Sequence, residues 1–526
     1  MSLARAWRRI VLCLLVGTLL AAGGSGCGKE AGPKRPPAER QPLPEKTAAI
    51  AGVKVTAGGG EVRDGVVHLA SFAIENGMIG YAPRVVSPDG RWVAFQGTQA
   101  GRQGLWVMAL DGSRGRLLAR VGEKEHAAGT LLLHFLGWTR DNRAVLACQG
   151  TQADGAHRGQ RGISIRVAAP DEGEAREVAW LPVPTGIVRQ IEFSPGRESV
   201  YVQAGDALWR LDITGGHKQL LRDGLPSYDG LFYPRLSPTG DYYVYELWEP
   251  DKKGIYVLCT RDAEEKVLKP NGPTWNFGPR FSADGSRLAY YTAPLRPGSA
   301  GEYAGDYDII PAEDGPASIA EAIEIATPGG EKVARVTVPG AKLANFRWAA
   351  DGRHLAFVAG KVKNPEGAAA GTELAAMAWH SLWVADADGK LTKVADLTGL
   401  EGVLWDIQVV NVSPDGKQVY YLVSRENELS LWLAREGKQP VEVAPGGGPW
   451  HHTYPGAVYG EDLFISRSVN GGEEVFRVRG TQATQITADG GCKAFLQVEG
   501  SRLVYVRENW SGGDNESRLV VLDCSS

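Results

Sequence analysis

The stretch Val85–Phe95 reads VVSPDGRWVAF, a short polar turn that leads into an alternating strand. Pro88 presets φ for a turn, Asp89 can bond back to its own backbone, and Gly90 supplies a positive φ. The apolar and polar side chains that follow alternate, as a half-buried strand requires. Seven copies recur at spacings of 43 to 67 residues, beginning at Val85, Gly137, Glu192, Arg235, Arg280, Arg347 and Asn411. A recurring unit of this length indicates a repeat architecture.

The second half of the unit recurs as well. In the first copy it reads as a strand over residues 105–110, a turn at Asp111-Gly112 and a further strand from Arg116. Each unit is therefore predicted to be a four-stranded antiparallel meander. Two more units, from Ala457 and Leu496, lack the S-P-D-G turn but keep the pattern, which makes nine candidates. Stacking such sheets radially buries both of their faces, which is the propeller solution.

These units resemble the TolB-type β-propeller repeat of bacterial envelope proteins. The S-P-D-G turn, the W-V-A-F strand at residues 92–95 and the L-W-V strand at residues 105–107 before D-G carry the resemblance, which covers roughly residues 81–524. It implies an all-β propeller. TolB also carries an α/β domain ahead of its propeller, and residues 28–64 are too few and too polar to form one. We therefore expect this chain to lack that domain.

The predicted fold is a single all-β propeller over residues 53–526. Nine units exceed the roughly four to eight blades that are typical, so we favour eight blades and leave seven to nine open. The last unit ends after its third strand, at Asp523. The strand-like segment Gly65–Ala70 precedes the first unit and has no partner of its own. We expect it to complete the last sheet and close the ring.

The beginning of the chain has the pattern of a secretory leader. Three arginines precede a thirteen-residue apolar core, Ile10–Ala22, which is too short to span a bilayer. The small residues Gly24–Gly26 before Cys27 resemble the lipobox of bacterial lipoproteins. The resemblance implies a signal peptide at residues 1–26, a lipid on Cys27 and a Pro-rich tether at residues 27–52. An ordinary signal peptide with an incidental cysteine is the alternative.

We therefore expect an extracytoplasmic protein anchored by lipid to the bacterial cell membrane, or to an outer membrane if the host has one. The net charge is −4, and removal of a leader that contains three arginines and no acid makes it more negative. This argues against a nucleic-acid partner. Motifs for nucleotide binding and for a G-x-S-x-G nucleophile are missing from the sequence, and no spacing matches a metal site. We predict no catalytic residue, metal or cofactor, and a monomer.

The functional prediction concerns the loops. The turns between first and second and between third and fourth strands are short and monotonous, whereas the connections on the other face are long, varied and rich in aromatics. Such clusters suit recognition of a peptide or a sugar. The predicted ligand-binding residues are Tyr228, Asp229, Phe232, Trp275, Phe277, Trp405, Asp406, Trp450, His451, His452 and Tyr454.

The sequence thus favours a binding or scaffold propeller that recognises an envelope protein segment or a glycan on its loop-rich face. The alternative is a propeller enzyme, a lyase or hydrolase on polysaccharide or peptide. Its site would lie at the channel mouth and would need clustered His, Asp and Arg. The aromatics could equally pack between blades.

Overall fold

The computed structural model describes part of the chain between residues 46 and 525. The described ranges are 46–80, 84–122, 131–152, 156–171, 173–183, 188–225, 231–247, 254–270, 274–294, 320–362, 377–402, 407–425, 428–444, 457–469, 472–509 and 516–525. Within them the secondary structure is β-strand, without an α-helix. These ranges accordingly contain no helix that could cross a membrane.

The strands form nine antiparallel sheets, numbered here along the chain. Sheet 1 holds β4 (Gly77–Ile79), β5 (Trp92–Gln99), β6 (Arg102–Ala109) and β7 (Gly115–Arg120). Sheet 2 holds β8 (Leu131–Trp138), β9 (Ala144–Thr151), β10 (Arg161–Ala168) and β11 (Arg176–Pro182). Sheet 3 holds β12 (Val188–Phe193), β13 (Ser199–Ala204), β14 (Ala207–Asp212) and β15 (Lys218–Arg222).

The next three sheets repeat this order. Sheet 4 holds β16 (Leu231–Leu236), β17 (Tyr242–Leu247), β18 (Gly254–Cys259) and β19 (Glu265–Pro270). Sheet 5 holds β20 (Thr274–Phe281), β21 (Leu288–Pro294), β22 (Ala322–Ala326) and β23 (Lys332–Val336). Sheet 6 holds β24 (Lys342–Trp348), β25 (His354–Val362), β26 (Met377–Asp386) and β27 (Leu391–Gly402).

The last three sheets complete the series. Sheet 7 holds β28 (Ile407–Val412), β29 (Gln418–Arg425), β30 (Glu428–Arg435) and β31 (Val441–Ala444). Sheet 8 holds β32 (Ala457–Tyr459), β33 (Asp462–Val469), β34 (Gly472–Arg479) and β35 (Gln482–Gln485). Sheet 9 has six strands, in the order β1 (Lys46–Ile50), β2 (Val53–Arg63), β3 (Val66–Ile74), β38 (Glu516–Asp523), β37 (Arg502–Asn509) and β36 (Cys492–Glu499).

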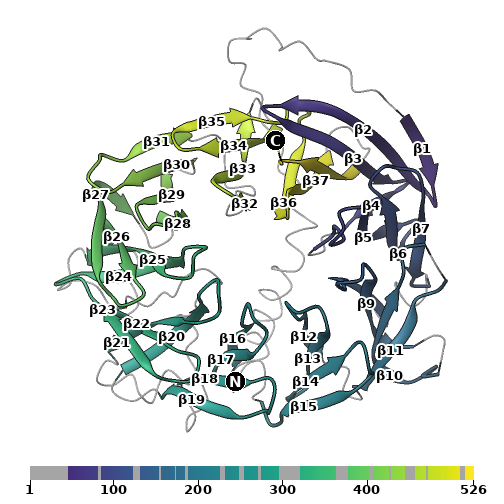
Figure 1. The fold of residues 1–526 in the computed structure, drawn as a ribbon, viewed down its shortest axis with the longest axis horizontal. Coiled ribbons are helices and arrows are strands. Elements are labelled where there is room, and N and C mark those ends of the chain that lie inside the picture. The colour runs from purple at the N-terminus through teal and green to yellow at the C-terminus, as the bar shows by residue number, and fades with distance from the viewer. Residues whose placement is uncertain are drawn as a thin grey trace, which may run out of the picture. The chain divides into compact units, whose positions relative to one another are not determined.

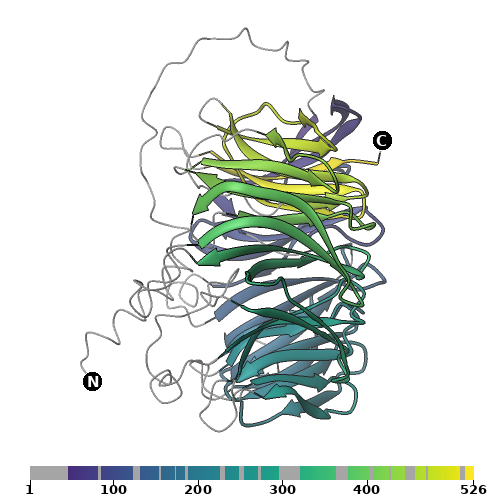
Figure 2. The same cartoon turned by 90° about the vertical axis from the view of Figure 1, so that its left-hand side faces the viewer.

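The sheets follow one another around a common centre, with the fourth strands at the periphery and the first strands at the inner edge (Figure 1). Strands run between the two faces of this arrangement (Figure 2). Four-stranded antiparallel sheets placed in this way fit the β-propeller that the repeat predicted.

The recurring turn is closed by the same backbone hydrogen bond in the copies that follow the S-P-D-G pattern. In sheet 1 the Gly90 amide donates to the Ser87 carbonyl oxygen at 2.9 Å, and Gly90 has φ +67°. The Ser87 hydroxyl oxygen accepts from the Trp92 amide at 3.0 Å, which starts the second strand. Three further copies repeat the glycine-to-serine bond, from Gly240, Gly285 and Gly416. The turn is thus a structural hairpin.

Consecutive sheets share buried apolar cores. Ile163 of sheet 2 and Val202 of sheet 3 belong to one such core, and Leu382 of sheet 6 and Tyr421 of sheet 7 belong to another. The same holds for every neighbouring pair of sheets, including sheet 9 with sheet 1. Each meander buries its two faces against its neighbours, as the repeat argument required.

Sheet 9 joins the two ends of the described chain. β3 pairs antiparallel with β38, with Phe72 opposite Leu519, so the segment expected to complete the last unit does pair with its third strand. The structure adds two strands that the sequence analysis did not predict. β2 pairs with β3, and β1 pairs with β2. Residues 27–52 were predicted to be a tether. β1 lies within this range, so sheet structure begins at Lys46, before the predicted end of the tether.

Sheet 1 begins differently from the other sheets. Its first strand is Gly77–Ile79, whereas the apolar residues just before the S-P-D-G turn contribute a single bridge, Val86 to Val93. The described residues contain nine sheets, one more than the favoured count of eight and within the range of seven to nine.

Candidate functional site

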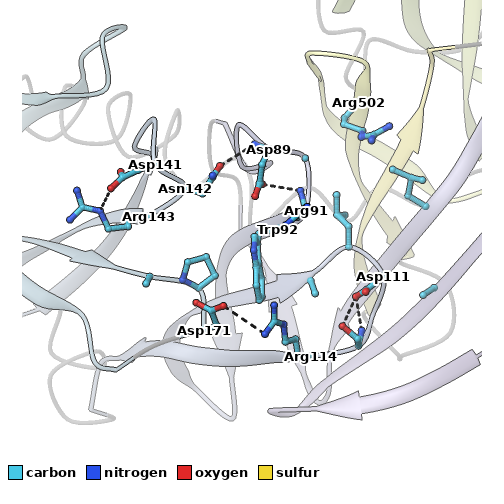
Figure 3. Close-up of a pocket in the computed structure, with 18 of the residues that line it drawn as sticks. Asp89, Arg91, Trp92, Asp111, Arg114, Asp141, Asn142, Arg143, Asp171 and Arg502 are labelled. Atoms are coloured by element: carbon cyan, nitrogen blue, oxygen red, sulfur yellow. Dashed lines mark hydrogen bonds and ion pairs between the residues drawn. The ribbon is translucent and has the colours of Figure 1, made fainter.

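A cavity lies on the face formed by the short turns. Its volume is about 1070 Å³. The walls come from the turns of sheets 1 and 2, from strands β2 and β3, and from Arg502 at the start of β37. The charged and aromatic residues that line it are Asp89, Arg91, Trp92, Asp111, Arg114, Asp141, Arg143, Asp171 and Arg502 (Figure 3).

The first wall is the S-P-D-G turn of sheet 1. The Asp89 carboxylate accepts the Arg91 amide at 3.0 Å, which fixes the turn from inside. The Asp89 amide donates to the side-chain oxygen of Asn142 at 3.0 Å, which joins this turn to that of sheet 2. Arg502 of sheet 9 lies on the other side, because a Cβ added at Gly90 would come within 3.7 Å of its Nη2 atom. The turn is therefore held between two neighbouring sheets.

The second wall is the turn between β6 and β7. The Asp111 carboxylate accepts the Ser113 amide at 2.9 Å and its hydroxyl at 2.6 Å. These hydrogen bonds lower the pKa of Asp111, so it is ionised at neutral pH. Gly112 packs directly on β2, since a Cβ there would lie 3.0 Å from the Cβ of Ala57. The added strand β2 thus forms part of the cavity wall.

Trp92 lies between these walls, as Figure 3 shows. Its side chain is only 6% exposed. The Arg114 guanidinium sits 4.8 Å from the centre of the indole ring, a cation–π contact. Arg114 also approaches Asp171 of sheet 2, with 3.7 Å between Nη1 and Oδ2. The Trp92 indole therefore lies at the bottom of the cavity, beneath the charged Arg114 side chain.

The third wall comes from sheet 2. Asp141 and Arg143 form an ion pair with 2.8 Å between Oδ2 and Nε. Burial opposes ionisation of Asp141, but its hydrogen bond with Thr139 and the charge of Arg143 together lower its pKa. The loop that carries Asp171 is held by Arg116, whose guanidinium donates to the carbonyl oxygens of Ala169 and Pro170.

The resulting surface carries four carboxylates and four guanidiniums on short, hydrogen-bonded turns. Such an arrangement is suited to bind a polar ligand with charges of both signs through charge-assisted hydrogen bonds. In the part of the chain that the structure describes, no group of three or more His, Cys, Asp and Glu could hold a metal ion.

Most residues predicted to bind a ligand fall outside the described ranges: Tyr228, Asp229, Trp405, Asp406, Trp450, His451, His452 and Tyr454. Phe232 and Trp275 lie near the starts of β16 and β20, at the ends of these strands away from the turn face. The structure does not bring them to the cavity.

The structure places Phe277 in an apolar core. Its side chain is 0% exposed and lies in the core shared by sheets 5 and 6. Its ring stacks on Tyr291, with 5.2 Å between ring centres. Phe277 is therefore a packing residue, as the alternative for these aromatics held.

The cavity was not predicted from the sequence, because the short turns recur in most units and have the pattern of structural turns. One signal was present. Asp precedes Arg by two or three residues in three turns of sheets 1 and 2, at Asp89-Arg91, Asp111-Arg114 and Asp141-Arg143. What the sequence could not show is that β2 and Arg502 of β37 complete the walls.

No protein-family model matches the chain, and no curated protein matches it. Solved structures similar to it include TolB from Acinetobacter baumannii, at 15% identity over 68% of this chain and 82% of that one, with a TM-score of 0.26. An oligogalacturonate lyase in complex with manganese is similar at 12% identity over 76% and 97% of the two chains, with a TM-score of 0.34. A eukaryotic initiation factor is similar at 11% identity over 79% and 91%, with a TM-score of 0.40. Likeness at this level assigns no function.

Proposed function

We propose that this chain is an extracytoplasmic binding propeller, tethered to a membrane by lipid on Cys27, that holds a segment of an envelope protein. The cavity on the turn face carries the proposal. It offers about 1070 Å³ of space between walls that combine carboxylates and guanidiniums. The leader pattern before Cys27 supports the location.

A protein segment suits this cavity better than a neutral glycan. A polypeptide presents ammonium, guanidinium and carboxylate groups along one extended strand, and each can pair with an opposite charge on the walls. Sugar recognition would need open aromatic faces, and the indole of Trp92 is buried beneath Arg114.

The proposal includes a ring of nine blades closed by β3. The pairing of β3 with β38 and the shared core of sheets 9 and 1 support it. In a closed ring the last blade packs against the first. The turns of sheets 9, 1 and 2 would therefore keep fixed positions around the cavity.

Charge reversal across the cavity tests the site. The variants Asp171→Lys and Arg114→Glu should each weaken capture of the partner from envelope extracts at least tenfold. Arg140 and Glu198 form a similarly exposed pair with 3.6 Å between their charged atoms, and neither lines the cavity. The variants Arg140→Glu and Glu198→Lys are therefore matched controls that should keep capture.

Two results would contradict the proposal that the partner binds in the cavity of the turn face. Equal losses in the cavity and control pairs would show a general charge effect. Unchanged capture in the cavity variants, together with loss in a Trp275→Ala, Trp405→Ala, Trp450→Ala triple variant, would place the partner on the loop-rich face.

A further inference from the structure

A smaller cavity lies on the turn face between sheets 4 and 5. Its volume is about 330 Å³, near the lower end of the range for ligand pockets. It is lined by Tyr242, the first residue of β17, and by the turn between β18 and β19. Pro328, two positions after the end of β22, lines it from sheet 5. The cavity thus joins the turns of two consecutive sheets.

This cavity uses the same repeat positions as the first cavity, between sheets 1 and 2. In sheets 1 and 4 the aromatic residue that follows the S-P-x-G turn opposes the last residue of the third strand. The amide of that last residue donates to the carbonyl oxygen five positions further on. The lining residues in equivalent places are Trp92 and Tyr242, Ala109 and Cys259, Asp111 and Arg261, Arg114 and Glu264, and Pro170 and Pro328.

The charges at these positions differ between the two cavities. In the first cavity the chain supplies its own cation, because Arg114 lies over the Trp92 ring and approaches Asp171. Glu264 occupies the place of Arg114 in the smaller cavity, and Gly329 occupies the place of Asp171. The covering cation and its acidic partner are therefore both replaced.

The aromatic ring of the smaller cavity is accordingly more open. Tyr242 is half-buried, whereas Trp92 is 6% exposed. None of the cation–π contacts among the described residues involves Tyr242. The carboxylates of Glu264 and Asp262 line the same cavity. The Glu264 amide donates to Asp262 Oδ1 at 3.0 Å, and this hydrogen bond lowers the pKa of Asp262, which is therefore ionised at neutral pH.

Two cations of the chain also line this cavity, and both have acidic partners. Arg261 Nε lies 3.4 Å from Asp241 Oδ1, outside the cavity lining. Lys266 Nζ lies 3.5 Å from Glu264 Oε1, and the two side chains are 55% and 62% exposed. So exposed an ion pair contributes little stability. A cation brought by a ligand can therefore take the place of Lys266 beside Glu264.

We propose that this cavity binds the cationic group of an arginine or lysine side chain from another protein. The cation lies over the Tyr242 ring and pairs with the Glu264 and Asp262 carboxylates, as Arg114 of the chain itself does with Trp92 and Asp171. The contact combines a cation–π interaction with charge-assisted hydrogen bonds. The two cavities share no lining residue, so the proposal goes beyond the proposed function and can fail separately from it.

The test is a ligand-observed NMR titration of the full chain at low ionic strength and pH 7. The probes are N-acetyl-arginine amide and N-acetyl-lysine amide, with N-acetyl-citrulline amide as the neutral isostere of the first. Saturable binding of at least one charged probe is expected, and the neutral probe should bind at least about tenfold more weakly.

Three variants test the named contacts. Glu264→Gln should weaken binding of the charged probe about threefold or more, because a charge-assisted contact is lost. Tyr242→Leu should weaken it roughly two- to fivefold through loss of the cation–π contact. Lys266→Gln should strengthen it roughly two- to fivefold, because the competing cation is removed. A purely structural role of these residues would not produce changes of opposite sign.

Glu198→Gln is the matched control. Glu198 is 60% exposed and pairs with Arg140 at 3.6 Å, as Glu264 pairs with Lys266, and it lines neither cavity. It should bind the probes like the unaltered chain. Equal binding of the citrulline probe, absence of saturable binding by both charged probes, or unchanged affinity in Glu264→Gln would overturn the proposal. Binding that is lost in Asp171→Lys and kept in Glu264→Gln would place the cation in the first cavity and would also overturn it.

Discussion

The Glu499 carboxylate accepts a hydrogen bond of 2.7 Å from the backbone amide of Val85. Its other oxygen accepts one of 2.8 Å from the amide of Val86. Glu499 ends β36 in the last sheet, whereas the two valines lead into the first S-P-D-G turn. One acidic side chain thereby ties the last sheet to the first, 414 positions apart in the sequence.

This contact predicts a pH-dependent stability. Burial raises the pKa of Glu499 to about 7, although the two amides oppose the shift. A raised pKa means that the folded chain binds a proton that the unfolded chain releases. Stability from this group is therefore full below its ordinary pKa and is lost as the pH rises from there through 7, by about 3 kcal/mol in total.

Urea unfolding at pH 5 and pH 8 measures this effect. Glu499→Gln cannot ionise and should remove that part of the pH dependence. Glu198→Gln, an exposed acid of sheet 3, should keep it. An unchanged pH profile in Glu499→Gln would show that other groups set the dependence.

Asp462 should be essential to the packing of sheet 8. Its carboxylate pairs with Arg477, whose side chain is 5% exposed, and with Arg479. Arg477 also donates to the carbonyl oxygen of Asp64, between β2 and β3. Asp462→Asn leaves the buried Arg477 paired only with the half-exposed Asp64 carboxylate, 3.7 Å away, among the ion pairs of the described residues, and should lower the unfolding free energy by about 3 kcal/mol.

The exposed pair Asp241–Arg261 provides the comparison for Asp462. Asp241→Asn should cost less than about 1 kcal/mol, because the partners are open to water. Similar losses from Asp241→Asn and Asp462→Asn would argue that burial of Arg477 does not decide the effect.

Closure through β3 predicts a large effect from one apolar side chain. Phe72 is 0% exposed and lies 5.9 Å, ring centre to ring centre, from Phe95 of sheet 1. Phe72→Ala should cost about 3 to 5 kcal/mol, because it empties the core between the last and first sheets. Chemical unfolding measures it, and Leu220→Ala on the exposed outer strand β15 should change little. A loss below 1 kcal/mol for Phe72→Ala would argue against closure.

The proposed lipid on Cys27 predicts a change of location when that residue is replaced. Cys27→Ser removes the only thiol of the lipobox-like sequence and should move the protein from the membrane to the soluble fraction. Fractionation followed by immunoblotting measures this. A variant that stays with the membrane would show that the chain is held by other means.

The architecture was predictable because the repeat encodes it locally. Pro88, Asp89 and Gly90 specify a turn from their own chemistry, and the alternation after them specifies a strand. The missing fourth strand of the last unit also predicted a partner before the first unit. β1 and β2 were missed because their residues are short of large apolar side chains, and only their pairing with β3 gives them strand structure.

The cavity was not predictable in the same way. Its walls join residues of sheets 1, 2 and 9, such as Asp89, Asp171 and Arg502, which are far apart in the sequence and which the packing of these sheets against one another brings together. The burial of Phe277 depends likewise on the next sheet. Aromatic content alone could not distinguish a packing residue from a binding residue.

Site-specific photo-crosslinking tests the central claim most directly. Ser113 is exposed, lines the cavity and caps the Asp111 turn. Thr214 is exposed and caps the corresponding Asp212 turn in sheet 3, away from the cavity. A photoreactive residue at position 113 should capture a specific envelope protein in the native host, whereas the same residue at position 214 should not. Capture at both positions alike, or at neither, would contradict the account.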